Sequence, residues 1–79
     1  MNIKKGDKVL LYAESTLRKK YGVVNGSLEV ARLPLYETMR EMLGKVWEVI
    51  EYDRRIKVSN GDSAWWFPIE CVKKVIKHE

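Results

Sequence analysis

The stretch from Ser63 to Val72 constrains the fold more than any other part of the chain. It holds two of the three tryptophans, the single phenylalanine and one of the two prolines. The aromatic residues at 63–67 favour a β-strand, and Pro68 ends it because proline lacks the N–H that a strand ladder needs. The stretch therefore predicts a strand, a turn and the start of a last strand.

Four more short segments carry strand patterns: 8–13, 45–53, 55–59 and 72–76. In 55–59 the alternation is regular, with Ile56 and Val58 facing inward. Asn60-Gly61 is typical of a tight hairpin turn between this strand and the aromatic one. Five short strands joined by tight turns favour a mainly β fold, a small five-stranded barrel.

An insertion of about residues 14–44 separates the first and second strands. Residues 14–25 are polar and basic and could hold a short helical turn, but Gly22 and Gly26 interrupt any long helix. We therefore expect a long loop anchored by Leu17 and Tyr21. A small hairpin around Asn25-Gly26 is an alternative for part of this loop.

The second half of the insertion predicts a short helix. Pro34 is suited to a first helical turn, and Gly44 is suited to a helix end. An apolar stripe at helical spacing lies between them, formed by Leu35, Met39, Met42 and Leu43. We therefore expect a helix of about nine residues that packs on the sheet.

Length and composition predict one domain, 1–79, without catalytic machinery. The single cysteine, Cys71, excludes an internal disulfide, and with the single histidine, His78, it leaves no zinc framework. We expect no enzyme, no catalytic or metal-binding residue and no cofactor. No apolar run approaches the roughly 20 residues of a membrane span, and the chain begins without a signal-peptide core. A cytoplasmic location without a membrane partner is therefore expected.

Three short motifs resemble those of Src-homology-3 (SH3) type barrels: Lys5-Gly6-Asp7-Lys8-Val9, Gly44-Lys45-Val46 and Trp65-Trp66-Phe67-Pro68. The layout is most similar to short uncharacterised barrel proteins of bacteriophages and bacteria. In those proteins a Tyr-Gly loop, a Met-containing helix and a Gly/Asn hairpin accompany a Trp-Trp pair. The resemblance implies an SH3-like barrel with a helix-bearing insertion. In function it implies a phage-type protein that binds and modulates a bacterial host protein.

The two adjacent tryptophans face opposite sides of a strand. We expect Trp65 to share the core with Phe67, and Trp66 to be the more exposed. The alternative is that the helical stripe covers the second tryptophan. Exposed tryptophan, tyrosine and arginine side chains dominate protein interfaces. The candidate protein-binding residues are therefore Trp66, Tyr21, Tyr36, Arg54 and Arg55.

The net charge of +4 is concentrated at the two ends of the chain. In barrels of this class the first and last strands lie close together, so the lysines of the two ends would form one patch. They are Lys4, Lys5, Lys8, Lys73, Lys74 and Lys77, and Arg18, Lys19 and Lys20 would enlarge the patch if they lie nearby. Such a patch attracts an acidic protein surface or phosphates, although lysines on edge strands also limit aggregation.

A second resemblance favours nucleic acid as the alternative partner. Gly44-Lys45-Val46, followed by Val49 and Ile56-Lys57-Val58, is similar to ribosomal and transcription-factor barrels of the KOW type. A structural role in a larger assembly is a third possibility, and the sequence leaves the oligomeric state open.

Overall fold

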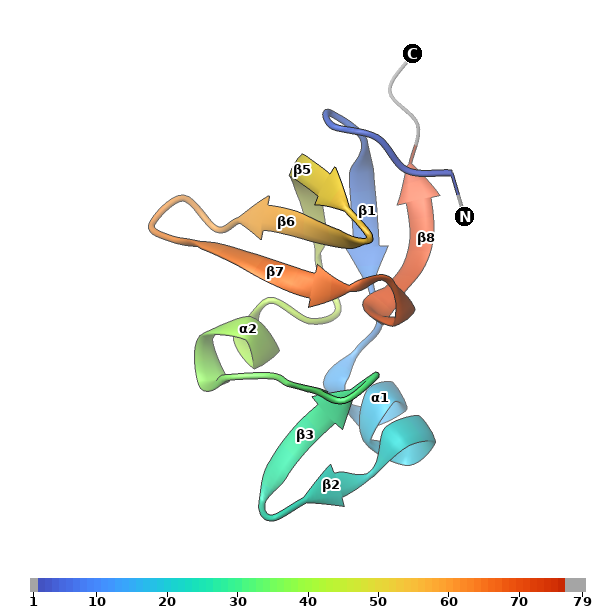
Figure 1. Ribbon diagram of the computed structural model, residues 1–79, viewed down its shortest axis with the longest axis vertical. Coiled ribbons are helices and arrows are strands. Elements are labelled where there is room, and N and C mark those ends of the chain that lie inside the picture. The colour runs from blue at the N-terminus through green and yellow to red at the C-terminus, as the bar shows by residue number, and fades with distance from the viewer. Residues whose placement is uncertain (1, 77–79) are drawn as a thin grey trace.

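The structure, a computed structural model, describes residues 2–76 and is mainly β, as the sequence predicts (Figure 1). Its strands are β1 (Lys8–Leu11), β2 (Val23–Val24), β3 (Ser27–Val30), β4 (Leu33–Pro34), β5 (Val46–Asp53), β6 (Arg55–Ser59), β7 (Ala64–Pro68) and β8 (Val72–Ile76). Two α-helices, α1 (Glu14–Tyr21) and α2 (Glu37–Glu41), lie in the insertion, and a short 3₁₀ turn, η1 (Ile69–Cys71), joins β7 to β8.

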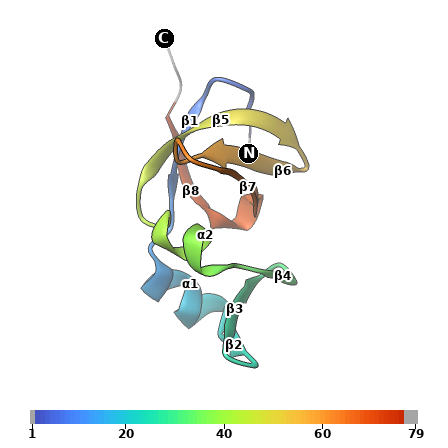
Figure 2. The same cartoon turned by 90° about the vertical axis from the view of Figure 1, so that its left-hand side faces the viewer.

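The five predicted strands form one antiparallel sheet in the order β7-β6-β5-β1-β8. Within residues 2–76, β7 and β8 lie at the two edges and do not pair with each other, so the sheet is not a closed ring. Figure 2 shows β5 curving over the other strands. A register irregularity between Val49 and Glu51 lies in this strand, and such irregularities bend and twist a strand.

The core lies on the inner face of this curved sheet. Ile56, Val58 and Phe67 are all fully buried there, which confirms the predicted alternation along β6 and β7. Trp65 is partly buried and packs against the same core. The last strand closes the core only in part, because Val72 is buried but Ile76 is 38% exposed.

Residues 14–21 form the helix α1, so the prediction of a long loop was wrong for this segment. Leu17 is buried, as expected of an anchor, and supplies the packing that a short helix needs. On the exposed side Arg18 pairs with Glu14 one turn earlier, with 2.7 Å between Nε and Oε2. Gly22, at a φ of 78°, ends the helix.

A second, three-stranded antiparallel sheet follows in the order β2-β3-β4. Its first hairpin turns at Asn25-Gly26, so the alternative hairpin in the insertion is confirmed. Leu28 and Val30 of β3 are fully buried. Their burial joins this small sheet to the core of the protein.

The helix α2 is shorter than predicted and begins at Glu37 rather than at Pro34. Pro34 lies in β4 instead, opposite Glu29. The Leu35 N–H donates to the Leu28 carbonyl at 2.9 Å, which keeps this segment extended against β3. The four residues of the predicted apolar stripe are nevertheless all buried. In the described part of the chain, both helices are too short and too polar to cross a lipid bilayer.

Candidate protein-binding surface

The register of β6 with β7 fixes which aromatic side chain faces outward. Ile56 pairs with Phe67 on the buried face, so the next pair, Lys57 with Trp66, faces the other side. Trp66 is 36% exposed, which agrees with the expectation that it is the more exposed of the two adjacent tryptophans.

Side chains of three neighbouring strands, β7, β6 and β5, interact with one another at Trp66. The Lys57 Nζ lies 5.7 Å from the centre of the Trp66 ring and 3.3 Å from Oε2 of Glu51 on β5. A cation over an exposed ring contributes about 0.5–1 kcal/mol. Lys57 therefore helps to hold the indole in place, and Glu51 holds Lys57.

Three hollows on the described surface meet at Trp66. The largest, about 710 Å³, also includes Arg55 and Leu33. The second, about 290 Å³, shares these residues and adds Met39 of α2. The third, about 560 Å³, lies against residues 3–5 of the N-terminal loop. The three hollows thus form one continuous, uneven surface, and Trp66 lies where they meet.

The second hollow has aromatic walls. The Tyr36 and Trp65 rings lie 6.2 Å apart, tilted by 51°, and Tyr36 is 62% exposed. The indole N–H of Trp65 is buried and has no acceptor among the described residues. A buried donor without an acceptor costs about 1–3 kcal/mol. Arg55 is the one charged residue among those that line this hollow.

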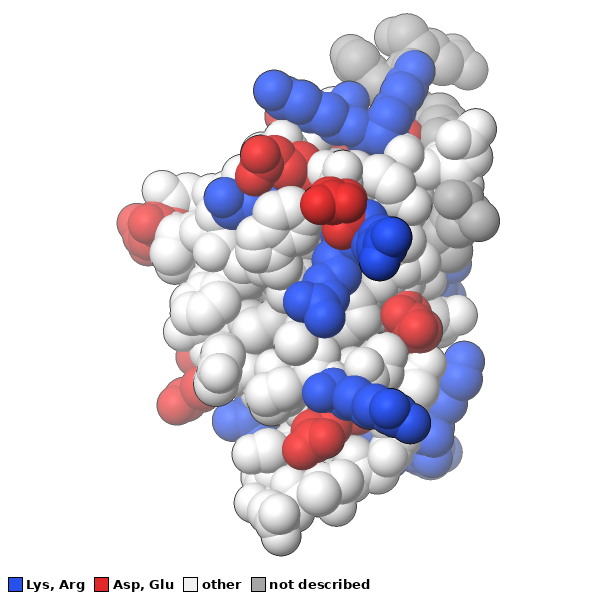
Figure 3. Space-filling view, viewed as in Figure 1, with Lys and Arg blue, Asp and Glu red and all other residues white. Residues whose placement is uncertain are grey.

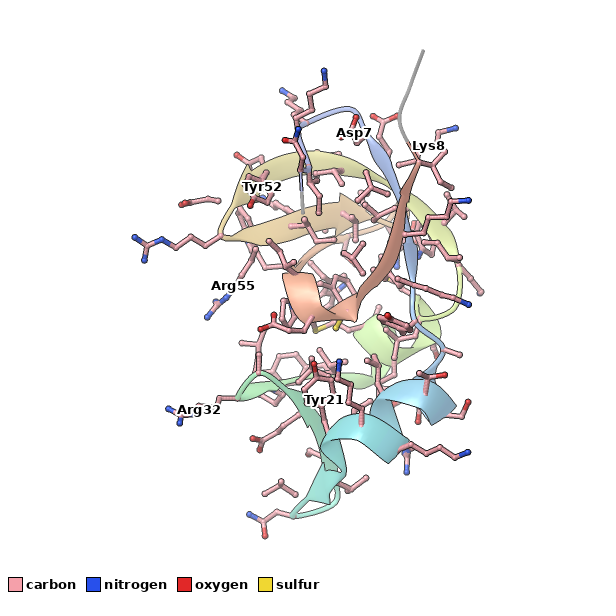
Figure 4. All side chains as sticks on the ribbon, turned by 90° about the vertical axis from the view of Figure 1, so that its right-hand side faces the viewer. Asp7, Lys8, Tyr21, Arg32, Tyr52 and Arg55 are labelled. Atoms are coloured by element: carbon pink, nitrogen blue, oxygen red, sulfur yellow. The ribbon has the colours of Figure 1, made fainter. Side chains whose placement is uncertain are left out.

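Arg54 forms the tight turn between β5 and β6, and Arg55 is the first residue of β6. Arg54 has a φ of 62°, so it occupies the left-handed region at the tip of the turn. Both side chains are exposed, and within residues 2–76 neither makes an ion pair. Figure 4 shows Arg55 projecting away from the sheet. Two unpaired guanidinium groups therefore border the largest hollow, together with Asp53 and Glu70.

The structure gathers four of the five predicted protein-binding residues, Trp66, Tyr36, Arg54 and Arg55, around these hollows. Tyr21 lies elsewhere, on α1, where it packs against the core and Lys20 lies 5.5 Å from its ring centre (Figure 4). Sequence reasoning missed the opposite wall, Leu33-Pro34 of β4. A strand of two residues has no periodicity that would reveal it.

The basic residues do not form one patch on the face in Figure 3, where blue and red side chains are interspersed. The pairing of β1 with β8 does place Lys8 and Lys74 on adjacent strands. Glu48 lies opposite Lys8 on the other side of β1. The helix α1, with its three basic residues, lies at the far end of the molecule from Lys8 (Figure 4). Lys77 lies outside the described residues.

Asp7, which sequence reasoning did not place in a site, has a structural role. Asp7 is 1% exposed, and its Oδ2 accepts the Lys4 N–H at 3.1 Å. Its carbonyl accepts the Val49 N–H at 2.8 Å. The first bond closes the N-terminal turn, and the second attaches this turn to β5.

Cys71 is fully buried, as expected of a small core residue. Burial, helped by the charge of Glu70, raises the pKa of its thiol to about 12. Such a thiol stays protonated and unreactive at neutral pH. Among residues 2–76 no three acidic, cysteine or histidine side chains form a group that could hold a metal ion. His78 lies outside the described residues.

Comparisons with protein-family models, curated proteins and solved structures found no match to this chain.

Proposed function

We propose that the chain is a non-enzymatic protein-binding module that contacts its partner through the surface around Trp66. The observation that carries the proposal is that all three hollows meet at this exposed indole. Tryptophan and arginine are the residues most enriched in interface hot spots, where truncation often costs 2 kcal/mol or more. Trp66 would be the apolar contact, and Arg54 and Arg55 would receive carboxylates.

The partner that fits this surface is a protein with acidic side chains, because both arginines lack an ion-pair partner within the described residues. The sequence resemblance adds that the module is an SH3-like, phage-type protein acting on a bacterial host protein in the cytoplasm. The five-stranded sheet, the insertion between β1 and β5 and Pro68 before the final turn support the SH3-like class.

Affinity capture from a bacterial lysate, quantified by mass spectrometry, tests the role of Trp66. The variants are Trp66→Ala and a control, Val46→Ala, which truncates an exposed apolar residue of β5 that lines none of the three hollows. We expect proteins captured by the wild type and by the control to be lost with Trp66→Ala. Equal capture by a folded Trp66→Ala protein, checked by circular dichroism, would show that the surface is wrongly assigned.

The pairing of β1 with β8 favours one second candidate, a nucleic-acid-binding barrel that uses the lysines of the chain ends. Binding of labelled DNA and RNA, followed by fluorescence anisotropy, should then fall steeply between about 50 and 200 mM salt, because phosphate contacts release counterions. Lys74→Glu should weaken it, and Lys45→Glu serves as the matched charge reversal. The absence of binding at low salt, or binding that salt does not change, rejects this candidate.

A further inference from the structure

The outer edge of β7 is open. In the described residues β7 pairs with β6 on one side and with no strand on the other. An open edge presents backbone N–H and C=O groups that can pair with another strand. Trp65 and Trp66 both lie on this edge strand. The residues that line the hollows therefore sit beside unpaired backbone.

A second open edge faces the first. Among the described strands β4 pairs with β3 alone, and its residues Leu33 and Pro34 line the same 290 Å³ hollow as Ala64, Trp65 and Trp66 of β7. Small-molecule pockets usually run from about 300 to 1,000 Å³. A hollow at the lower limit of that range, between two strand edges, is better matched to side chains of an extended chain.

We propose that an extended, acidic segment of a partner protein adds to the β7 edge as a further antiparallel or parallel strand, between β7 and β4. This inference rests on the proposed protein-binding function and specifies its partner. Strand addition supplies affinity through main-chain hydrogen bonds and specificity through pockets for alternate side chains. The β7 edge and the adjacent hollow provide both.

The alternation along β7 determines the pattern of the segment. Trp65 faces the core side and Trp66 the outer side, and side chains of an added strand follow the same alternation. Apolar side chains on one face would enter the hollow beside Met39 and Trp65. Side chains on the other face would lie beside Trp66 and Arg55, where an unpaired guanidinium favours a carboxylate. The segment should therefore alternate apolar and acidic residues.

The aromatic wall adds one more contact. Tyr36, which packs over Trp65, is largely exposed. Trp65 lines the same hollow, and its buried indole N–H lacks an acceptor among the described residues. A backbone carbonyl of the added strand is an acceptor of the kind that this donor needs.

Labelled peptides of about six residues, matching the length of a typical strand, test the proposal by fluorescence anisotropy. The first alternates aspartate and leucine, and its counterpart carries lysine in place of aspartate. We expect the wild-type chain to bind the acidic peptide at least about tenfold more tightly than the basic one. Arg55→Glu should remove this preference, whereas Lys45→Glu, a matched charge reversal away from the hollows, should keep it. Equal affinity for both peptides contradicts the charge assignment.

Backbone pairing is tested with two versions of the acidic peptide, each N-methylated at every second residue. One version carries the methyl groups on the odd-numbered residues and the other on the even-numbered residues, which are the two possible frames. Alternate N–H groups of a strand point to opposite neighbours, so methylation should abolish binding in one frame and spare it in the other. Loss in both frames, or in neither, overturns strand addition. Strand addition by a partner is also overturned if light scattering shows a dimer and this dimer does not bind the peptide. In that case a second copy of the chain would occupy the β7 edge.

The two proposals can fail separately. If no peptide binds but capture from lysate still depends on Trp66, strand addition is wrong and the protein-binding surface stands. If the acidic peptide binds in a single methylation frame with unchanged affinity for Trp66→Ala, the edge is correct and Trp66 is not the contact.

Discussion

Adjacent residues in β7 have opposite roles, and the difference can be measured. Phe67 is fully buried whereas Trp66 is 36% exposed. Truncating a buried phenylalanine to alanine costs about 3–5 kcal/mol. Truncating Trp66 removes an exposed ring and its contact with Lys57, so we expect a loss nearer to about 1 kcal/mol.

Urea denaturation of Phe67→Ala and Trp66→Ala checks this difference, with circular dichroism as the probe because both changes alter fluorescence. A loss of stability with Trp66→Ala as large as that of Phe67→Ala would place Trp66 in the core. Its effect on binding would then have a structural cause.

The buried thiol of Cys71 predicts a pH dependence of stability in the alkaline range. Its pKa is raised from 9.0 to about 12 by burial, with a smaller contribution from Glu70. Below pH 9 the thiol is protonated in both the folded and the unfolded chain. Between pH 9 and 12 the unfolded chain alone loses the proton, so folding stability falls as pH rises.

The free energy of unfolding is expected to fall by about 1.4 kcal/mol per pH unit above pH 9 because of Cys71. This fall adds to the change that all other groups produce. Denaturation of the wild type and of Cys71→Ala at pH 8 and pH 10.5 isolates this contribution. The variant should lose less stability than the wild type over that interval. Parallel losses would mean that Cys71 is not buried in a way that favours its protonated form.

At the scale of elements, a substitution in α1 can show whether packing or local sequence stabilises this helix. Leu17 is 1% exposed, and a helix of eight residues is too short to be stable alone. Leu17→Ala should therefore lower the free energy of unfolding by about 2–5 kcal/mol. The exposed neighbour Thr16 is the control, since Thr16→Ala should change it by less than about 0.5 kcal/mol. Similar values for the two variants would indicate that α1 does not contribute to the core.

The same helix shows why part of the fold was not predictable. Residues 14–21 are mostly charged or polar, and the side chains that hold Leu17 come from distant strands such as β3. By contrast, β6 carries its own alternation, and Asn60-Gly61 carries its own turn signal. The Asn60 Oδ1 accepts the N–H groups of Asp62 and Ser63, each at 2.9 Å. Local patterns located these elements because local contacts form them.

At the scale of the whole molecule, the candidate binding surface was predictable in part. The exposure of Trp66 could be predicted from strand alternation, and the exposure of Arg54 and Arg55 from their place at a tight turn. The opposite wall, Leu33-Pro34, lies about thirty residues away in sequence and meets Trp66 through the folded insertion. The basic residues of α1 lie apart from Lys8 for the same reason, because the fold places α1 at the far end of the molecule.

The most direct test of the central claim is site-specific photo-cross-linking in bacterial cells. A photoreactive amino acid replaces Ala64, an exposed residue beside Trp66 that lines the second hollow, or Ser15, an exposed residue of α1. We expect a discrete cross-linked protein from position 64 and none from position 15. Cross-linking from position 15 alone, or from neither position, would contradict the claim that this chain binds a protein through the surface around Trp66.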